Sequence, residues 1–172
     1  MMTSEYKQRK RRLADWDYSS GGIYFVTFCT IGREPLLGRI ISAEDSSGIE
    51  AVFQPSRIGA LCEEAIANIG DRFDGATIDR YTIMPNHVHL LIEITEESAC
   101  EPVGRHAKIV PQIVASIKSA VTRKAREESL EFKVWQQSYH DHIVRNEADL
   151  SRIREYIDQN PLKWAIDKFY VE

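Results

Sequence analysis

Two histidines at alternating positions of an apolar segment are the residues best suited to chemistry in this chain. His87 and His89 are separated by Val88 and followed by a run of apolar residues that ends near Ile94. In a β-strand, successive side chains point to opposite faces, so both imidazoles would share one face. Two imidazoles on one side of a rigid strand can supply half of a divalent-metal site.

A second segment near the C-terminus could complete that site. Tyr156 and Asn160 are four residues apart in a predicted helix, so they share one helical face. If this face lies over the two histidines, Asn160 supplies a carbonyl oxygen and Tyr156 a phenol. Two imidazoles, an amide oxygen and open positions suit Mg²⁺ or Mn²⁺ bound to phosphate oxygens, and do not suit a closed structural zinc site. The alternative is a purely structural role, with the ring packed and the amide ending the helix.

A phenol placed in line with a phosphodiester can act as a nucleophile toward phosphorus. Tyrosine is a weak nucleophile at its ordinary pKa near 10, so it needs activation. A divalent metal that polarises the phosphate and offsets the charge of the transition state provides that activation. The product would be a covalent phosphotyrosine.

Length and composition are typical of one soluble domain. The chain has 172 residues, of which 43% are hydrophobic and 28% are charged. Its longest apolar runs fall short of the roughly 20 residues that cross a bilayer, and the polar, basic N-terminus does not resemble a signal peptide. Cys29, Cys62 and Cys100 are scattered, which favours reduced thiols in the cytoplasm. We therefore expect a cytoplasmic protein with no membrane partner.

The net charge of −4 does not by itself indicate nucleic-acid binding, but the basic residues are clustered. One cluster lies in an N-terminal arm over residues 1–20 and another along a predicted helix. Arg152 is best placed for a backbone phosphate, since it lies one helical turn before Tyr156. The alternative for such clusters is a solvated face. The candidate DNA-binding residues are Arg9, Lys10, Arg11, Arg12, Lys118, Arg123, Lys124, Arg145 and Arg152.

Hydrophobic periodicity and turn residues predict the order strand, helix, strand, strand, helix, strand, helix. The predicted strands cover 23–31, 78–84, 87–95 and 139–145, and the predicted helices cover 56–69, 108–128 and 146–160. The segment 32–48 is predicted as a loop. The first six elements match the split β-α-β, ferredoxin-like pattern of an α+β fold, with an antiparallel sheet and two helices on one face. The last helix is additional, and residues 21–172 form a single domain.

Three motifs in order resemble one known family. The run 81–92, with its paired histidines, resembles the signature of single-tyrosine HUH transposases of the IS200-like superfamily. The run 135–146 followed by 156–161 is similar to the REP-associated tyrosine transposases within that superfamily. The opening 21–27 also fits, so the resemblance extends over residues 21–164.

The resemblance implies a metal-dependent single-stranded DNA endonuclease and strand transferase that cleaves next to hairpins. It implies that His87, His89 and Asn160 hold Mg²⁺ or Mn²⁺ and that Tyr156 is the nucleophile, leaving a 5′-phosphotyrosine and a free 3′-hydroxyl. The expected partner is single-stranded DNA with REP-like or palindromic hairpins, bound by a monomer or homodimer near the bacterial nucleoid. His142 could orient a metal ligand or approach the phosphate.

Two other functions remain open at this point. A domesticated relative could bind hairpin DNA with little or no nuclease activity. A phosphodiesterase with two histidine motifs would turn over without a protein–DNA adduct and would not need Tyr156. His140 and His142 form a second alternating pair, but the charged Asp141 between them makes a second metal site unexpected.

Overall fold

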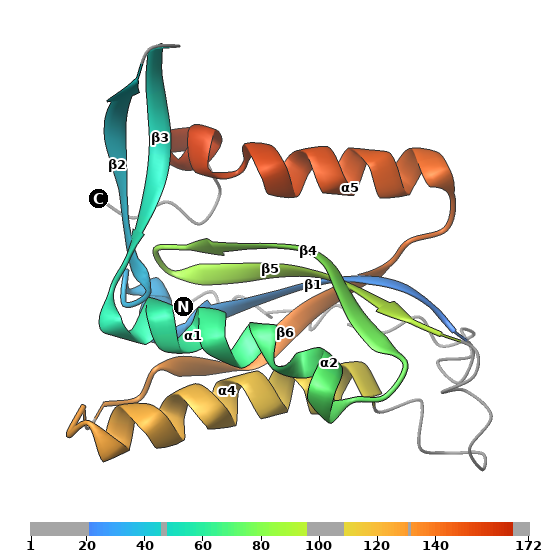
Figure 1. Cartoon of the computed structure of the whole chain (residues 1–172), viewed down its shortest axis with the longest axis horizontal. Helices are drawn as coiled ribbons and strands as arrows, with labels where there is room; N and C mark the ends of the chain where they lie inside the picture. The colour runs from blue at the N-terminus through green and yellow to red at the C-terminus, as the bar shows by residue number, and fades with distance from the viewer. Residues whose placement is uncertain (1–20, 46–47, 96–108, 131, 167–172) are drawn as a thin grey trace, which may run out of the picture.

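A four-stranded antiparallel sheet with helices on both faces forms the centre of the molecule (Figure 1). The computed structural model describes residues 21–45, 48–95, 109–130 and 132–166. The strand order is β4-β5-β1-β6, and every neighbouring pair is antiparallel. This order confirms the predicted α+β architecture. The strands are β1 (Gly22–Thr30), β4 (Ala76–Met84), β5 (His87–Ile94) and β6 (Trp135–Ile143).

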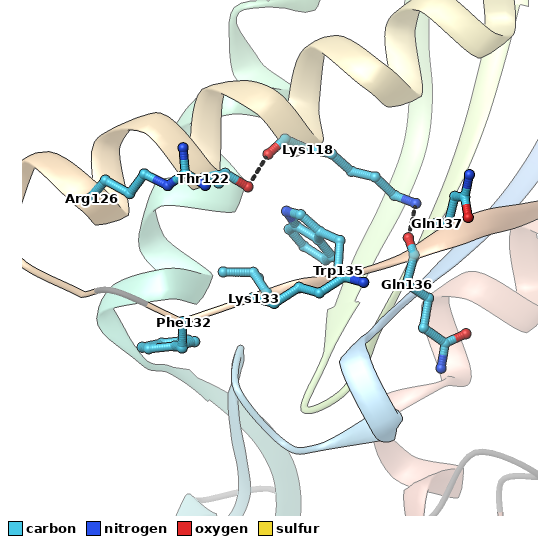
Figure 2. Close-up of a pocket in the computed structure, with 9 residues that line it drawn as sticks. Lys118, Thr122, Arg126, Phe132, Lys133, Trp135, Gln136 and Gln137 are labelled. Carbon is cyan, nitrogen blue, oxygen red and sulfur yellow. Dashed lines mark hydrogen bonds between the residues drawn. The ribbon is translucent and has the colours of Figure 1, made fainter.

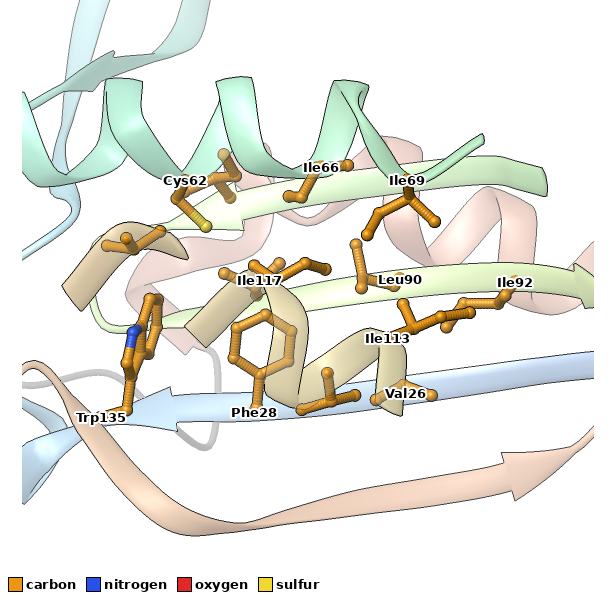
Figure 3. Packing of buried hydrophobic residues seen from close by; sticks show 14 of the residues in the cluster. Val26, Phe28, Cys62, Ile66, Ile69, Leu90, Ile92, Ile113, Ile117 and Trp135 are labelled. Atoms are coloured by element: carbon orange, nitrogen blue, oxygen red, sulfur yellow. The ribbon is translucent and has the colours of Figure 1, made fainter. Parts of the chain in front are cut away.

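Helices α1, α2 and α4 cover one face of the sheet, and α5 covers the other (Figure 1). Alternation in β5 explains this division. Val88, Leu90 and Ile92 belong to the large core between the sheet and helices α1 and α4. Leu91 points to the other face and packs in a smaller cluster between the sheet and α5. Figure 3 shows the large core between the sheet and its helices. These helices are α1 (Arg57–Ala67), α2 (Ile69–Arg72), α4 (Ile109–Glu127) and α5 (Glu147–Gln159).

The segment predicted as a loop over 32–48 is largely a β-hairpin, so that prediction was wrong. After a short 3-10 turn, η1 (Ile31–Arg33), strands β2 (Gly38–Asp45) and β3 (Gly48–Pro55) pair antiparallel as a separate sheet. The adjacent Ile40 and Ile41 break strict alternation, and the segment is rich in turn-forming residues, so the periodic signal was weak. The hairpin extends from the sheet beside the C-terminal 3-10 segment η3 (Pro161–Ile166) (Figure 1).

Two other element boundaries differ from their predictions. The helix predicted over 56–69 is divided at Asn68, where α1 ends and the short α2 begins. Strand β6 begins at Trp135, four residues before the predicted start, because the ring of Trp135 packs edge-on against Phe28, with the centroids 5.3 Å apart. Because the residues that follow Trp135 are polar, the pattern of apolar residues did not indicate that the strand begins there.

The start of α5 is built as predicted. The Asn146 side chain accepts a hydrogen bond from the backbone N–H of Asp149 at 2.9 Å, which is the geometry of an N-cap. The apolar face of the helix then buries Leu150, Ile153 and Ile157 against the sheet. The N-cap and this face together fix which residues of α5 lie over β5.

Replacing this cap should weaken the whole domain measurably. For Asn146→Ala we expect the free energy of unfolding to fall by about 1 kcal/mol, because an N-terminal N–H of α5 loses its acceptor. Urea denaturation measures the change, with the exposed Glu155→Ala on the same helix as the control. A loss no larger than that of the control would contradict the capping role.

Within the described ranges, no helix is long and apolar enough to cross a membrane.

Candidate active site

His87 and His89 lie side by side on the face of β5 that α5 covers. They are 0% and 1% exposed, and their Nε2 atoms are 3.1 Å apart. The strand alternation predicted from the sequence therefore places both rings together, as expected. Two buried imidazoles directed at a common point are a suitable pair of nitrogen ligands for a divalent cation.

Neighbouring polar groups orient both rings through their Nδ1 atoms. The Asn86 side-chain N–H donates to the carbonyl oxygen of Arg33 at 3.0 Å, so its Oδ1 faces His87 Nδ1 at 2.8 Å. Because an amide oxygen only accepts, His87 Nδ1 carries the proton and Nε2 carries the lone pair. The Thr27 hydroxyl lies 2.7 Å from His89 Nδ1. Such contacts to the outer ring nitrogen are typical of metal-binding histidines.

Tyr156 on α5 reaches the same point from the opposite side of the layer. Its hydroxyl oxygen lies 3.3 Å from His89 Nε2, and the two rings meet at 66° with their centroids 5.2 Å apart. Phe25 on β1 stacks on His89 at 5.2 Å and contacts the edge of Tyr156 at 6.0 Å. The half-buried phenol is thus held against the histidine pair by ring packing as well as by its hydroxyl.

Asn160 ends α5 one turn after Tyr156 and is 1% exposed. Its side-chain oxygen is buried and has no hydrogen-bond partner among the described residues. Such a group costs roughly 1–3 kcal/mol when it remains unpaired. Four residues further on, Trp164 lies 6.0 Å from the His87 ring between centroids, so this part of the chain covers the pair.

The donor set fits a hard divalent cation better than a structural zinc ion. Among the residues that the structure describes, there is no group of three or more His, Cys, Asp or Glu residues that could hold a metal. The available donors are two imidazole nitrogens and the unpaired amide oxygen of Asn160. A neutral, incomplete set of this kind leaves positions open for phosphate oxygens.

Polar side-chain contacts at both edges of the sheet hold α5 in place. Arg154 donates two hydrogen bonds to Asp79 on β4, at 2.8 and 3.1 Å. At the other edge, His142 Nε2 on β6 lies 2.8 Å from a carboxylate oxygen of Asp149, which Arg152 also contacts. The hydrogen bond from His142 is the largest cause of a lowered pKa for Asp149. Tyr156 is carried by the helix between these two attachments.

His142 therefore contacts the first turn of α5 and not the histidine pair. In the pairing of β1 with β6, His142 lies opposite Phe25. Phe25 is two residues before Thr27, which lies opposite His89 in the pairing of β1 with β5. This contact makes His142 a residue that positions the helix.

The predicted DNA-binding residues that the structure describes do not form one surface. Arg9, Lys10, Arg11 and Arg12 lie outside the described residues. Arg123 and Lys124 pair with Glu127 and Glu64, and Arg152 pairs with Asp149. Arg145 is exposed just after β6, near the start of α5. Lys118 lies on the opposite face of the sheet from the histidines, over the ring of Phe28.

Sequence analysis missed three residues that shape the site. Thr27 is opposite His89 only because β1 pairs with β5, and this register is not visible in the sequence. Asn86 precedes His87 directly, and this position next to a histidine was a usable signal. Trp164 lies near His87 only because the chain after α5 folds back over the pair.

Comparison with known proteins shows the family of this chain. A family model described as "Transposase IS200 like" matches residues 24–160, which contain both histidines, Tyr156 and Asn160. The chain belongs to the IS200-like transposase family. The resemblance inferred from the motifs is thereby confirmed.

Two relatives of this IS200-like protein come from Haemophilus influenzae. One is an uncharacterized protein that is 36% identical over 99% of this chain and its own full length. The other is a provisionally named REP-associated tyrosine transposase, 29% identical over 47% of this chain and 47% of its own length.

A solved structure of a REP-associated tyrosine transposase bound to a REP hairpin is similar in fold. The similarity has a TM-score of 0.58 with 19% sequence identity, and it covers 88% of this chain and 73% of that one. At this identity the likeness shows a shared fold.

Proposed function

We propose that this IS200-like protein is a metal-dependent single-stranded DNA endonuclease and strand transferase that acts through Tyr156. The observation that carries the proposal is the approach of the Tyr156 hydroxyl to His89 Nε2 at 3.3 Å, where His87 Nε2 also points. A phenol beside a pair of buried metal-type ligands is the arrangement that phosphodiester attack by tyrosine needs.

His87, His89 and Asn160 would hold Mg²⁺ or Mn²⁺. The unpaired, buried oxygen of Asn160 supports this assignment, because a cation would supply the partner it lacks. When bound, the cation would polarise the phosphate and offset negative charge in the transition state. The protein's own part is to orient the two rings through the contacts of their Nδ1 atoms with Asn86 and Thr27.

Tyr156 would transfer the phosphate in one balanced displacement. Its phenol gives up a proton to solvent water, and the phenolate oxygen forms a bond to phosphorus while the bond from phosphorus to the 3′-oxygen breaks. The leaving 3′-oxygen takes up a proton from solvent water to become a hydroxyl, so there is no net change in protons. The 5′-phosphate remains on Tyr156, and attack by another 3′-hydroxyl reverses the step and joins a new strand.

The substrate would be single-stranded DNA that carries hairpins. The protein of similar fold that was solved with a REP hairpin supports this choice, as does membership of a transposase family. We propose that the chain acts in the bacterial cytoplasm as a monomer or homodimer.

A covalent-adduct assay tests the proposal. The full chain is incubated with a labelled hairpin oligonucleotide that has unpaired flanks, with Mn²⁺ or with EDTA, and resolved on a denaturing gel. We expect a shifted protein–DNA band and a free 3′-hydroxyl product only with the metal. Cleavage without an adduct would indicate a phosphodiesterase, and binding without cleavage would indicate a regulatory DNA-binding protein; either outcome would overturn the proposal.

Asn160→Leu should stabilise the metal-free protein and weaken metal binding. The substitution removes a buried oxygen that has no partner in the described part of the chain, so we expect the free energy of unfolding to rise by about 1 kcal/mol in EDTA. Urea denaturation measures stability, and Mn²⁺ titration measures affinity. Destabilisation with unchanged metal affinity would show that Asn160 only ends the helix.

A further inference from the structure

A cationic pocket lies on the face of the sheet opposite to the histidine pair, between α4 and the start of β6. Its volume is about 830 Å³, within the range of ligand pockets. Figure 2 shows Trp135 between Lys118 and Lys133, with Gln136 and Gln137 following along β6. The wall contains three basic residues, two side-chain amides and no acidic residue.

The three basic residues that line this pocket lie close together and have no carboxylate partner among the described residues. Among the described residues, no carboxylate forms a salt bridge with Lys118, Arg126 or Lys133. Elsewhere among the described residues, six basic residues have carboxylate partners, whereas Arg39, Arg72, Arg145 and Lys163 form no salt bridge either; the six are Arg57, Arg80, Arg123, Lys124, Arg152 and Arg154. In a chain with a net charge of −4, this concentration of uncompensated positive charge favours an anionic ligand.

Lys118 is fixed at the inner end of the pocket. Its Nζ donates to the backbone carbonyls of Gln136 at 2.8 Å and Ser138 at 3.2 Å. An ammonium has three N–H donors, so one remains for a phosphate oxygen. The side chain is half-buried over Phe28, and its position is held before any ligand arrives.

The rim adds an aromatic surface to this charge. Phe132 is 44% exposed and is one of the lining residues. An exposed ring beside cations is the combination that binds unpaired nucleotides, because bases stack on the ring while phosphates meet the cations. The side-chain amide of Gln137, which lies on the same side of the edge strand β6 as Trp135, can hydrogen-bond to base edges.

We infer that this pocket binds unpaired nucleotides of the DNA substrate outside the cleavage position, and so anchors the strand that is cut on the other face. This inference rests on the proposed function for the identity of the strand. Because β6 is an edge strand of the sheet, a strand that leaves the histidine face can pass around it to reach the pocket.

The test measures affinity without chemistry, in full-length protein that carries Tyr156→Phe. The pocket variant is Arg126→Ala with Lys133→Ala. The matched control is Arg39→Ala with Arg72→Ala, which removes the same charge from exposed sites outside the pocket. The probes are a fluorescein-labelled hairpin with unpaired flanks and the same hairpin with none.

For the flanked probe, we expect the pocket variant to bind at least about tenfold more weakly than the control. The slope of log affinity against log salt should also become shallower, by about 0.7 for each lost phosphate contact. Phe132→Ala should weaken the flanked probe and leave the salt slope unchanged. Affinities equal to those of the control, or equal losses for both probes, would overturn the inference.

This outcome is independent of the adduct assay. If no adduct forms with wild-type Tyr156 but the pocket variant still loses the flanked probe, the proposed nuclease function fails and the anchor stands. If the adduct forms and the pocket variant binds like the control, the anchor fails and the nuclease function stands.

The pH dependence of binding gives a second readout. Burial lowers the pKa of Lys118 to about 8, so its charge is mostly present at neutral pH and is lost as the pH rises through that value. The other groups facing it are Arg126 on α4, Lys133 ahead of β6 and Cys29 on β1. Affinity for the flanked probe should therefore fall with rising pH, and Lys118→Arg should remove that step. An unchanged pH profile in Lys118→Arg would contradict a role for the ammonium.

Discussion

Tyr156→Phe should abolish the covalent protein–DNA adduct and leave DNA binding intact. The substitution removes only the hydroxyl, which lies 3.3 Å from His89 Nε2, and keeps the ring that packs against Phe25. Without a nucleophilic oxygen no bond to phosphorus can form, so we expect adduct formation to fall by about a thousandfold or more. Denaturing gels measure the adduct, and fluorescence anisotropy measures binding, which should change by less than about twofold because the phosphate and base contacts remain.

Tyr81→Phe is the matched control for this experiment. Tyr81 is an exposed tyrosine on β4 whose hydroxyl contacts Glu63 on α1, on the other side of the sheet from the histidine pair. Its loss should leave adduct formation unchanged. An adduct in Tyr156→Phe, or its loss in both variants, would refute the assignment of the nucleophile.

His87→Ala should lose metal-dependent cleavage. The ring is fully buried, its Nδ1 faces Asn86 Oδ1, and its Nε2 faces His89 Nε2, which makes Nε2 the proposed metal-binding atom. Removing one of the three proposed protein ligands should lower cleavage by at least about a hundredfold at a fixed Mn²⁺ concentration. Single-turnover cleavage across a Mn²⁺ titration separates weaker metal binding from a slower step at saturation.

The control for His87→Ala is His140→Ala. His140 lies in the same row across the sheet as Thr27 and His89, but it is exposed and belongs to β6. Cleavage by this variant should stay within about twofold of the parent, because its imidazole is not one of the proposed ligands. Undiminished activity of His87→Ala with Mg²⁺ would overturn the metal-binding role.

Much of the fold was predictable because its signals are local. The alternation that begins at His87 fixed both the strand and the shared face of the histidines, and Asn146 marked the start of α5. The spacing of four between Tyr156 and Asn160 correctly placed them on one helical face. What α5 would cover followed from the family resemblance and could not be derived from the helix alone.

The remaining features depend on contacts between distant segments. The hairpin of β2 and β3 was missed because its side chains do not alternate strictly, and its pairing is decided by tertiary contacts. Thr27 contacts His89 across a strand register that no local pattern encodes. The cationic pocket combines α4 with residues just before and within β6, so Arg126 and Lys133 could not be distinguished in advance from ordinary surface charges.

Mass spectrometry of the trapped adduct identifies the nucleophile of the proposed reaction. The wild-type chain is reacted with a hairpin oligonucleotide in Mn²⁺, the DNA is digested, and the peptides are sequenced. We expect a single 5′-linked nucleotide on the peptide that contains Tyr156, and none after EDTA treatment. A nucleotide on any other residue, or cleaved DNA with no modified peptide, would contradict it.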